Sequence, residues 1–276
     1  MSFTEFFSKG FLGHIVWSSD AGVAESTRII CMAIGILVTV IAAYLLGSLN
    51  FAIIISGKKY KQDIRSYGSK NAGMTNMMRT YGKKAAGITL LGDALKAVVS
   101  ALVGYAMLGY FGAYLAGLFC IIGHMFPVYY HFKGGKGVVT AAVSILMCNP
   151  IVFLILFVLF VLIVLATRYI SVGSIMCMLL YPIVLDRIYK WMYGEPCGYI
   201  IFAVLMTVLI VVKHYENIGR LLHGTESKFS FKKSVKAPED TPVEAEFTEA
   251  DDESAAAPEK RTKKANPSRH YGKKKK

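Results

Sequence analysis

Long apolar segments alternate with short polar loops along most of this chain. A helix that crosses a bilayer takes about 20 residues, and all but the last two segments reach that length. The segments cover about residues 29–56, 85–108, 110–130, 138–167, 171–187 and 198–213. This pattern predicts an all-α fold and a polytopic membrane protein.

Two of these boundaries depend on turn-forming residues. Gly109 and Gly112 mark a tight turn between the second and third segments. The stretch 138–167 is too long for one straight span, and Asn149 followed by Pro150 interrupts it, because proline cannot continue a helix from upstream. We therefore predict two spans there, about 137–148 and 150–167, and about seven transmembrane helices in all.

The basic residues cluster at 57–84, at 131–136 and beyond 212. Positive charge favours the cytoplasmic side of a membrane protein. We therefore expect these loops in the cytoplasm and an extracytoplasmic N-terminal segment over 1–28, which lacks the basic-then-apolar pattern of a cleaved signal peptide. The transmembrane domain is expected over 29–227. The composition changes at 228–276, where Lys, Glu, Pro and Ala dominate and predict a disordered, charged cytoplasmic tail.

Composition narrows the class of protein. Hydrophobic residues make up 54% of the chain and the mean hydropathy is +0.47, which excludes an ordinary soluble domain. The net charge of +13 raises nucleic-acid binding as an alternative, but its charges lie where cytoplasmic loops are predicted. None of the five cysteines forms a CxxC pair, so we interpret them as small buried hydrophobes rather than metal ligands or disulfides.

The loop 68–79, between the first two predicted spans, is rich in groups that bind phosphate. It reads GSKNAGMTNMMR and combines amides, hydroxyls and one arginine. Its glycines allow backbone N–H groups to approach a ligand. A phosphate site beside a membrane suggests phospholipid chemistry.

Two more polar patches lie in loops predicted on the same face. GHMFP at 123–127 is followed by KGGKG at 133–137. HYEN at 214–217 is followed by Arg220 and by GTE at 224–226. On a helix, His214 and Asn217 would share one side.

Several of these polar residues also have ordinary structural interpretations. His124 is typical of a hydrogen-bonded histidine at the edge of a span, and Asp93 and Lys96, three positions apart, can pair with one another. Ser171 and Ser174 open the sixth span, where they can either cap the helix or accept an anion. The concurrence of three patches on one predicted face favours a functional site.

Together the three motifs resemble those of the bacterial acyl-phosphate glycerol-3-phosphate acyltransferases. The resemblance covers about residues 40–227, with the motifs in order. Lys70 and Ala72 stand where the family's first motif commonly has glycine and proline. The resemblance implies an integral membrane enzyme that moves a fatty acyl group from acyl phosphate to the 1-hydroxyl of glycerol 3-phosphate, giving lysophosphatidate and phosphate.

The roles follow from this resemblance and from phosphate chemistry. The expected substrate-binding residues are Ser69, Asn71, Thr75, Asn76, Arg79, Lys133, Ser171 and Ser174, and the expected catalytic residues are His214, Asn217 and Lys136. An acyl phosphate carries a good leaving group, so it needs positioning and charge stabilisation more than covalent catalysis. His214 either orients glycerol 3-phosphate or acts as a base, and the leaving phosphate can instead take the hydroxyl proton. Acidic residues are sparse on this face, so we expect no metal and no cofactor.

Other functions remain as alternatives. No histidine is followed five positions later by aspartate, so the His-x4-Asp motif of other glycerolipid acyltransferases is absent. A transporter of phosphate or of an organic anion would also need positive loops, but it should place charge near the bilayer midplane.

We expect acyl phosphate, glycerol 3-phosphate and the lipid bilayer as partners, and contact with the enzyme that makes acyl phosphate is a further possibility. The expected location is the cell membrane, with the site facing the cytoplasm.

Overall fold

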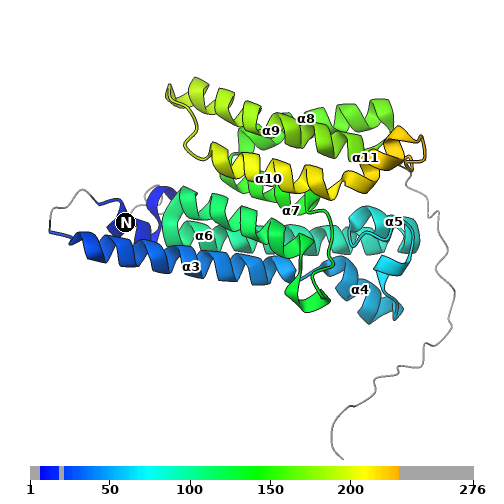
Figure 1. Ribbon diagram of the computed structural model, residues 1–276, viewed down its shortest axis with the longest axis horizontal. Helices are drawn as coiled ribbons and strands as arrows, with labels where there is room; N and C mark the ends of the chain where they lie inside the picture. Colours follow the sequence, from blue (N-terminus) through cyan, green and yellow to red (C-terminus); the bar gives the residue numbers. More distant parts are fainter. Residues whose placement is uncertain (1–6, 19–21, 230–276) are drawn as a thin grey trace, which may run out of the picture. The chain divides into compact units, whose positions relative to one another are not determined.

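Helices joined by short loops make up this computed structural model, which describes residues 7–18 and 22–229 and shows no strand in those ranges (Figure 1). The predicted all-α class is confirmed. The predicted tail, from residue 230 onward, and residues 1–6 and 19–21 lie outside the described residues.

The first long helix, α3 (Glu25–Ser48), carries small residues on one side and large apolar residues on the other. Its buried side includes Gly35, Thr39, Ala43 and Gly47, spaced four apart. Small residues at this spacing let two helices approach closely within a membrane. A Cβ on Gly47 would collide with the backbone of Cys120, so α3 lies directly against α6 (Lys83–Met125).

The first apolar segment is not one continuous helix, which corrects the predicted span over 29–56. Helix α3 ends at Ser48, Leu49 is extended, and α4 (Phe51–Tyr60) starts afresh. The Asn50 side chain caps α4 by accepting a hydrogen bond from the Ile53 N–H at 3.2 Å. This break places polar backbone close to the first motif.

Helix α6 folds back on itself, as the predicted turn required. Leu108 and Gly109 leave the helical conformation, with Gly109 at φ 62°, and separate an arm over 83–107 from an arm over 110–125. A Cβ on Gly104 or Gly112 would collide with the backbone of the other glycine, so the two arms touch there. The short helix α2 (Phe11–Val16) lies beside this turn, where Phe7 meets the Tyr105 ring edge-on at 5.0 Å.

The remaining helices complete the bundle. They are α5 (Met74–Tyr81), α7 (Val138–Cys148), α8 (Pro150–Thr167), α9 (Ile170–Tyr193), α10 (Ile200–Lys213) and α11 (Tyr215–Leu222), with short 3₁₀ turns at Ile64–Ser66 and Val128–Tyr130. The predicted turn at Asn149 and Pro150 is present, and Asn149 caps α8 through the Val152 N–H. The predicted sixth span, 171–187, is longer in the structure because α9 continues through Pro182 to Tyr193.

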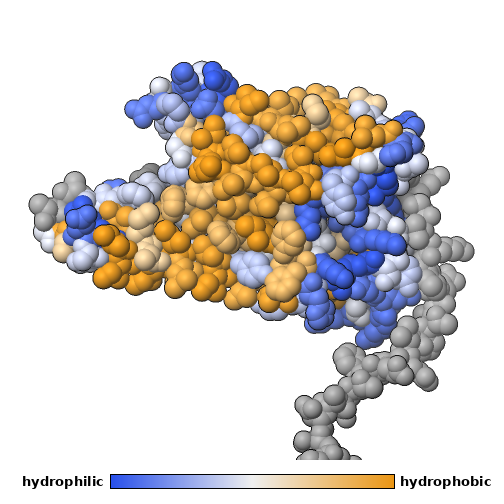
Figure 2. Space-filling view, in the orientation of Figure 1, coloured by the Kyte–Doolittle hydropathy of each residue, from blue (hydrophilic) through white to orange (hydrophobic). Residues whose placement is uncertain are grey.

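Four helical stretches of the described chain are long and apolar enough to cross a membrane. They are Glu25–Tyr60, Lys83–Tyr130, Pro150–Thr167 and Ile170–Tyr193, and α10 with α11 qualifies as a pair bent by 54°. Because α6 contributes two arms and α7 is a shorter apolar helix, the prediction of seven crossings stays a prediction. Figure 2 shows an apolar band across the middle and polar residues gathered at the end where α4, α5 and α11 lie in Figure 1.

Candidate active site

The first motif forms a loop that is organised around the side chain of Asn76. Its Oδ1 accepts a hydrogen bond from the Ser69 N–H at 3.0 Å. Its Nδ2 donates to the carbonyls of Tyr67 and Asn71 at 2.9 and 3.1 Å, and to that of Ile64 at 3.2 Å. The buried Asn76 amide is thus fully used in shaping the loop, so Asn76 holds Ser69 and Asn71 in place instead of offering a free group to a substrate.

Backbone conformation in this loop explains one departure from the family pattern. Gly68 and Lys70 both adopt the left-handed region, with φ values of 58° and 57°. Glycine is the usual residue in that region because it has no Cβ. Lys70 therefore keeps the backbone shape expected of the glycine that it replaces.

The glycine loop of the second motif, residues 133–137, packs against the end of α6. The N–H groups of Gly134 and Gly135 donate to the carbonyls of Met125 and His124 at 3.2 and 3.1 Å. A Cβ on Gly135 would collide with the His124 ring and with the Ala72 carbonyl. The glycine pair is therefore needed for the first and second motifs to meet.

His214 lies just beyond the end of α10, at the bend before α11. His214 is the N-cap residue of α11, which contains Asn217, and both side chains are buried, although the axis bends by 54° between α10 and α11. The Nδ1–H of His214 donates to the Ile210 carbonyl at 2.7 Å, which leaves Nε2 with its lone pair. Burial lowers the pKa of His214 to about 4, despite that hydrogen bond, so the imidazole is neutral near pH 7.

Glu226 ties the third motif to the start of α9. Its Oε1 accepts from Asn217 Nδ2 at 2.6 Å and from the Ser171 hydroxyl at 2.8 Å. Its Oε2 accepts from Arg220 Nε at 2.7 Å. Burial alone would raise the pKa of this carboxyl, but the hydrogen bonds from these three partners bring the pKa below its ordinary value.

Lys136 connects the second motif to the third. Its ammonium donates to Asn217 Oδ1, so that Asn217 bridges Lys136 and Glu226. Burial, together with repulsion from Arg220, lowers the pKa of Lys136 to about 8. Because burial and Arg220 disfavour the charged form of Lys136, a bound anion would stabilise that charge.

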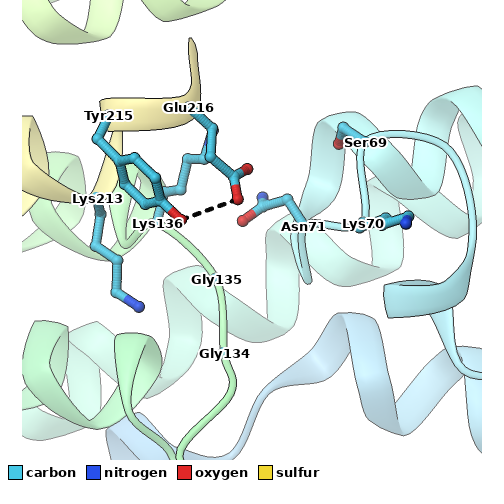
Figure 3. A pocket seen from close by; sticks show the side chains of 9 residues that line it. All are labelled: Ser69, Lys70, Asn71, Gly134, Gly135, Lys136, Lys213, Tyr215 and Glu216. Carbon is cyan, nitrogen blue, oxygen red and sulfur yellow. Dashed lines mark hydrogen bonds between the residues drawn. The ribbon is translucent and has the colours of Figure 1, made fainter. Parts of the chain in front are cut away.

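A cavity of about 170 Å³ opens between the three motifs. It is lined by Ser69, Lys70, Asn71, Gly134, Gly135, Lys136, Lys213, Tyr215 and Glu216 (Figure 3). The lining combines three lysines, one amide and glycine backbone with the carboxylate of Glu216. This donor set suits a phosphate or another compact anion.

Arg79 interacts electrostatically with Glu226 and Arg220. It is half-buried, and its Nη2 donates to the Ser227 carbonyl at 3.4 Å. Burial lowers the pKa of Arg79 from its ordinary value, while Glu226 opposes and Arg220 adds to that shift. Arg79 therefore shares the electrostatic environment of Glu226 and Arg220 without lining the cavity itself.

Other predicted site residues stand apart from the cavity. Thr75 lies half-buried in the first turn of α5, Lys133 is exposed, and the Ser174 hydroxyl donates to the Ile170 carbonyl within α9. The sequence interpretation omitted Lys213, Tyr215, Glu216 and Glu226 as site residues. The signal for Glu226 was present in the GTE triplet, because a carboxylate within a basic patch needs partners.

Comparisons with known proteins show the family of this chain. A family model described as glycerol-3-phosphate acyltransferase matches residues 37–224. A glycerol-3-phosphate acyltransferase of Finegoldia magna is 42% identical over 189 residues, covering 68% of this chain and 93% of that protein. One of Syntrophomonas wolfei is 40% identical over 192 residues, covering 70% and 96%.

Two solved structures share the fold. Both are crystal structures of PlsY (YgiH), described as an integral membrane glycerol 3-phosphate acyltransferase. The glycerol 3-phosphate form has a TM-score of 0.64 and 36% identity, and covers 71% of this chain and 96% of its own. The lysophosphatidic acid form has a TM-score of 0.62 and 35% identity, with coverages of 72% and 97%.

Proposed function

Because this chain belongs to the glycerol-3-phosphate acyltransferase family, we propose that it transfers a fatty acyl group from acyl phosphate to the 1-hydroxyl of glycerol 3-phosphate. The products are lysophosphatidate and inorganic phosphate. The membrane acyltransferase activity follows from the family and from its solved members, and these favour an enzyme over the alternative of an anion transporter. We propose the identity of the acyl donor, the choice of the 1-hydroxyl as acceptor and the roles of individual residues.

One observation carries this proposal: the three motifs meet at a cationic cavity at the polar end of apolar helices. Lys136 and Lys213 bring positive charge to the cavity. Arg79 and Arg220 do not line it, but their charges act on Lys136. The acceptor and the donor each carry a phosphate group. A site for two phosphates beside an apolar surface is what this pair of substrates requires.

The acceptor is proposed to bind between the second and third motifs. Lys136 is partly deprived of water and would gain a phosphate partner. Asn217 is held by Glu226 in a fixed orientation, so it can position an acceptor hydroxyl with little loss of entropy. Ser69 and Asn71, which Asn76 holds in place, would donate to the donor phosphate or to the oxygen that gains charge during transfer.

The reaction itself moves one acyl group between two oxygens. The 1-hydroxyl oxygen attacks the acyl carbon, the bond from that carbon to the phosphate oxygen breaks, and phosphate leaves. The hydroxyl proton passes to the leaving phosphate or through His214 Nε2, whose lone pair is free. A neutral His214 also suits a role as hydrogen-bond acceptor from the hydroxyl, and we favour that binding role.

Acyl phosphate as donor is supported by chemistry and by location. The described chain offers no nucleophile with an adjacent base, so an already activated donor is expected. Lys213 ends α10 and lies over the Phe126 ring at 4.1 Å, so one cavity wall joins a cation to an exposed aromatic side chain. An acyl chain can remain in the bilayer there while its phosphate enters the cavity.

The cell membrane is the proposed location, with the cavity facing the cytoplasm. Exposed lysines at the cavity end, including Lys58, Lys59, Lys83 and Lys84, support this orientation. The enzyme that makes acyl phosphate would then deliver its product to that face. Removal of divalent cations is not expected to slow the reaction, since the Glu226 oxygens already accept hydrogen bonds from three side chains.

The deciding experiment uses purified full-length protein in lipid nanodiscs, with glycerol 3-phosphate and a long-chain acyl phosphate. We expect lysophosphatidate and phosphate in equal amounts. Matched reactions contain the coenzyme A thioester or the carrier-protein thioester of the same fatty acid. Product from either thioester, and none from acyl phosphate, would refute the donor assignment while leaving the acyltransferase activity in place.

His214 and Asn217 have a test of their own. If both hold the acceptor, His214→Ala and Asn217→Ala raise the KM for glycerol 3-phosphate, whatever they do to kcat. If His214 is the base, its loss lowers kcat by about 10²–10⁴-fold instead. A His214→Ala enzyme with unchanged acceptor KM and a collapsed kcat would defeat the binding role.

A further inference from the structure

A cluster of charged and polar side chains lies buried inside the helix bundle, away from the cavity. Asp93 and Lys96 belong to the first arm of α6, and His124 lies near the end of the second arm. Their side chains are only 2%, 2% and 5% exposed. Charges at such depth are costly, so their retention needs an explanation.

The ammonium of Lys96 is the centre of this cluster. It lies 2.7 Å from Asp93 Oδ1, 2.8 Å from His124 Nδ1 and 2.8 Å from the Leu49 carbonyl. The ammonium donates hydrogen bonds to the Leu49 carbonyl and to His124 Nδ1, whereas its contact with Asp93 is an ion pair in which Oδ1 accepts no hydrogen bond. His124 therefore accepts through Nδ1, which leaves its Nε2 edge facing the glycine loop.

Two of the three partners of Lys96, Leu49 and His124, each connect to one wall of the cavity. Leu49 is the extended residue between α3 and α4, and its neighbour Asn50 donates from Nδ2 to the Ala72 carbonyl at 3.3 Å. Ala72 belongs to the first motif and directly follows Asn71.

The other partner leads to the glycine loop. The His124 carbonyl accepts from the Gly135 N–H, and the His124 ring leaves no room for a Cβ on Gly135. Gly135 directly precedes Lys136. The buried cluster thus touches the backbone behind both the first and the second motif.

We propose that Lys96, held by Asp93, is a positioning residue that sets the distance between the Asn71 wall and the Lys136 wall of the cavity. It does so through the Leu49 carbonyl on one side and the His124 ring on the other. This inference rests on the proposed function, since the two walls would then hold the two phosphates. Loss of the Lys96 contacts would let the walls drift, and a shift of about 1 Å can cost about 100-fold in rate.

A purely structural role makes a different prediction, and a pair of variants separates the two. Lys96→Met leaves the buried Asp93 charge with His124, 3.6 Å away, as its remaining basic partner, which should destabilise the protein in either case. The double variant Asp93→Asn with Lys96→Met removes the Asp93 charge as well. A purely structural cluster would then regain both stability and activity.

The experiment measures thermal unfolding and the glycerol 3-phosphate KM of purified protein in nanodiscs. For the double variant we expect an unfolding midpoint within about 3 °C of the native enzyme, but a KM that stays raised by about 10-fold or more. Tyr105→Phe is the matched control, because Tyr105 is buried in the same arm of α6 and donates to the Met147 carbonyl at 2.7 Å. It should leave KM unchanged.

A second comparison tests His124 on its own. His124→Gln keeps a group that can accept from Lys96, whereas His124→Leu does not. We expect the lower KM for the glutamine variant. Native KM in the double variant would overturn the role of Lys96, and equal KM values in the two His124 variants would overturn the role of His124.

Failure of the proposed function is distinguishable from failure of this inference. Calorimetric titration with glycerol 3-phosphate needs no donor and compares acceptor affinity among the same variants. If the native protein binds glycerol 3-phosphate but makes no product from acyl phosphate, the donor assignment fails. Weaker acceptor binding by the double variant than by Tyr105→Phe would still support the positioning role, and equal binding would refute it.

Discussion

Glu226 joins a side chain of α9 to two side chains of α11. It accepts hydrogen bonds from Ser171, Asn217 and Arg220, and Glu216 lies 3.7 Å from Arg220 as a second carboxylate. These two carboxylates are too few to neutralise Lys136, Lys213, Arg79 and Arg220. The remaining positive charge is what a substrate phosphate would balance.

Arg79→Ala should nearly abolish acyl transfer while the protein still inserts into the membrane. Arg79 is half-buried beside this cluster, and a charge-assisted contact with phosphate contributes about 1.5–3 kcal/mol. Arg79→Lys should also be weak, because an ammonium cannot replace the planar fork of the guanidinium. Turnover is measured on purified variants, with detergent extraction and gel filtration as controls for folding. Near-native turnover of the alanine variant would contradict the assignment.

The pH dependence should report Lys136 and not His214. The pKa of Lys136 is lowered to about 8, so its positive charge is present below that pH and is lost as the pH rises through it. We therefore expect the KM for glycerol 3-phosphate to rise above about pH 8. Lys136→Arg should move this rise to higher pH, because arginine stays charged.

On the acid side, His214 should not contribute an inflection. Its pKa of about 4 keeps it neutral from pH 5 upward. The substrate phosphate titrates near pH 6, as phosphate monoesters do, and that inflection should persist in His214→Gln. An inflection near pH 6.5 that occurs in the native enzyme and disappears in His214→Gln would show that His214 does titrate there.

At the scale of elements, apolar runs predicted which segments are helical but not where each helix breaks. The turn at Gly109 was predictable because glycine tolerates a φ of 62°. The break after Ser48 was not, because one asparagine in an apolar run is a weak signal. Lys96, which lies 47 positions away along the chain, donates a hydrogen bond to the Leu49 carbonyl at this break.

The sequence likewise predicted only part of the candidate site. The three motifs were predictable from residue type and spacing, since phosphate chemistry needs cations, amides and glycines. Which side chains face the cavity was not predictable, because that depends on contacts between distant segments. Asn76 and Asn71 are both asparagines, yet the Asn76 amide forms hydrogen bonds within its own loop, whereas Asn71 lines the cavity.

Asn50→Ala tests the break between α3 and α4. It removes the cap on α4 and the hydrogen bond to Ala72, so we expect a loss of about 1 kcal/mol in stability and a raised KM for glycerol 3-phosphate. Asn149→Ala is the matched control, since Asn149 caps α8 through the Val152 N–H in the same way. The control should lose similar stability without a change in KM. Equal KM values in the two variants would argue against any link between the break and the site.

At the scale of the whole molecule, the cavity and the exposed end of α9 lie at opposite ends of the bundle (Figure 1). The cavity lies at the end with α5 and α11, whereas α9 ends at the opposite side (Figure 1). Trp191, near that end of α9, is 78% exposed. Exposed tryptophan is typical of the boundary between lipid and water.

A cysteine-labelling experiment tests seven crossings with the N-terminus outside. In a cysteine-free background, an impermeant reagent applied to intact cells should modify Ser18→Cys and Lys190→Cys but not Lys59→Cys. Permeabilised cells should show labelling at all three positions. Modification of Lys59→Cys in intact cells would place the first motif outside and reverse the proposed orientation.

The spacing of Asp93 and Lys96 also bears on how the protein is made. The two residues are three positions apart on one helix, so their 2.7 Å ion pair needs no other segment. The charges can therefore neutralise one another as the first arm of α6 enters the membrane, before the second arm and His124 pack against it. Reversing the order of the two charges would keep that early neutrality, yet it would move the ammonium one turn away from Leu49. Such a variant should insert as efficiently as the native chain and still fail to assemble a working site.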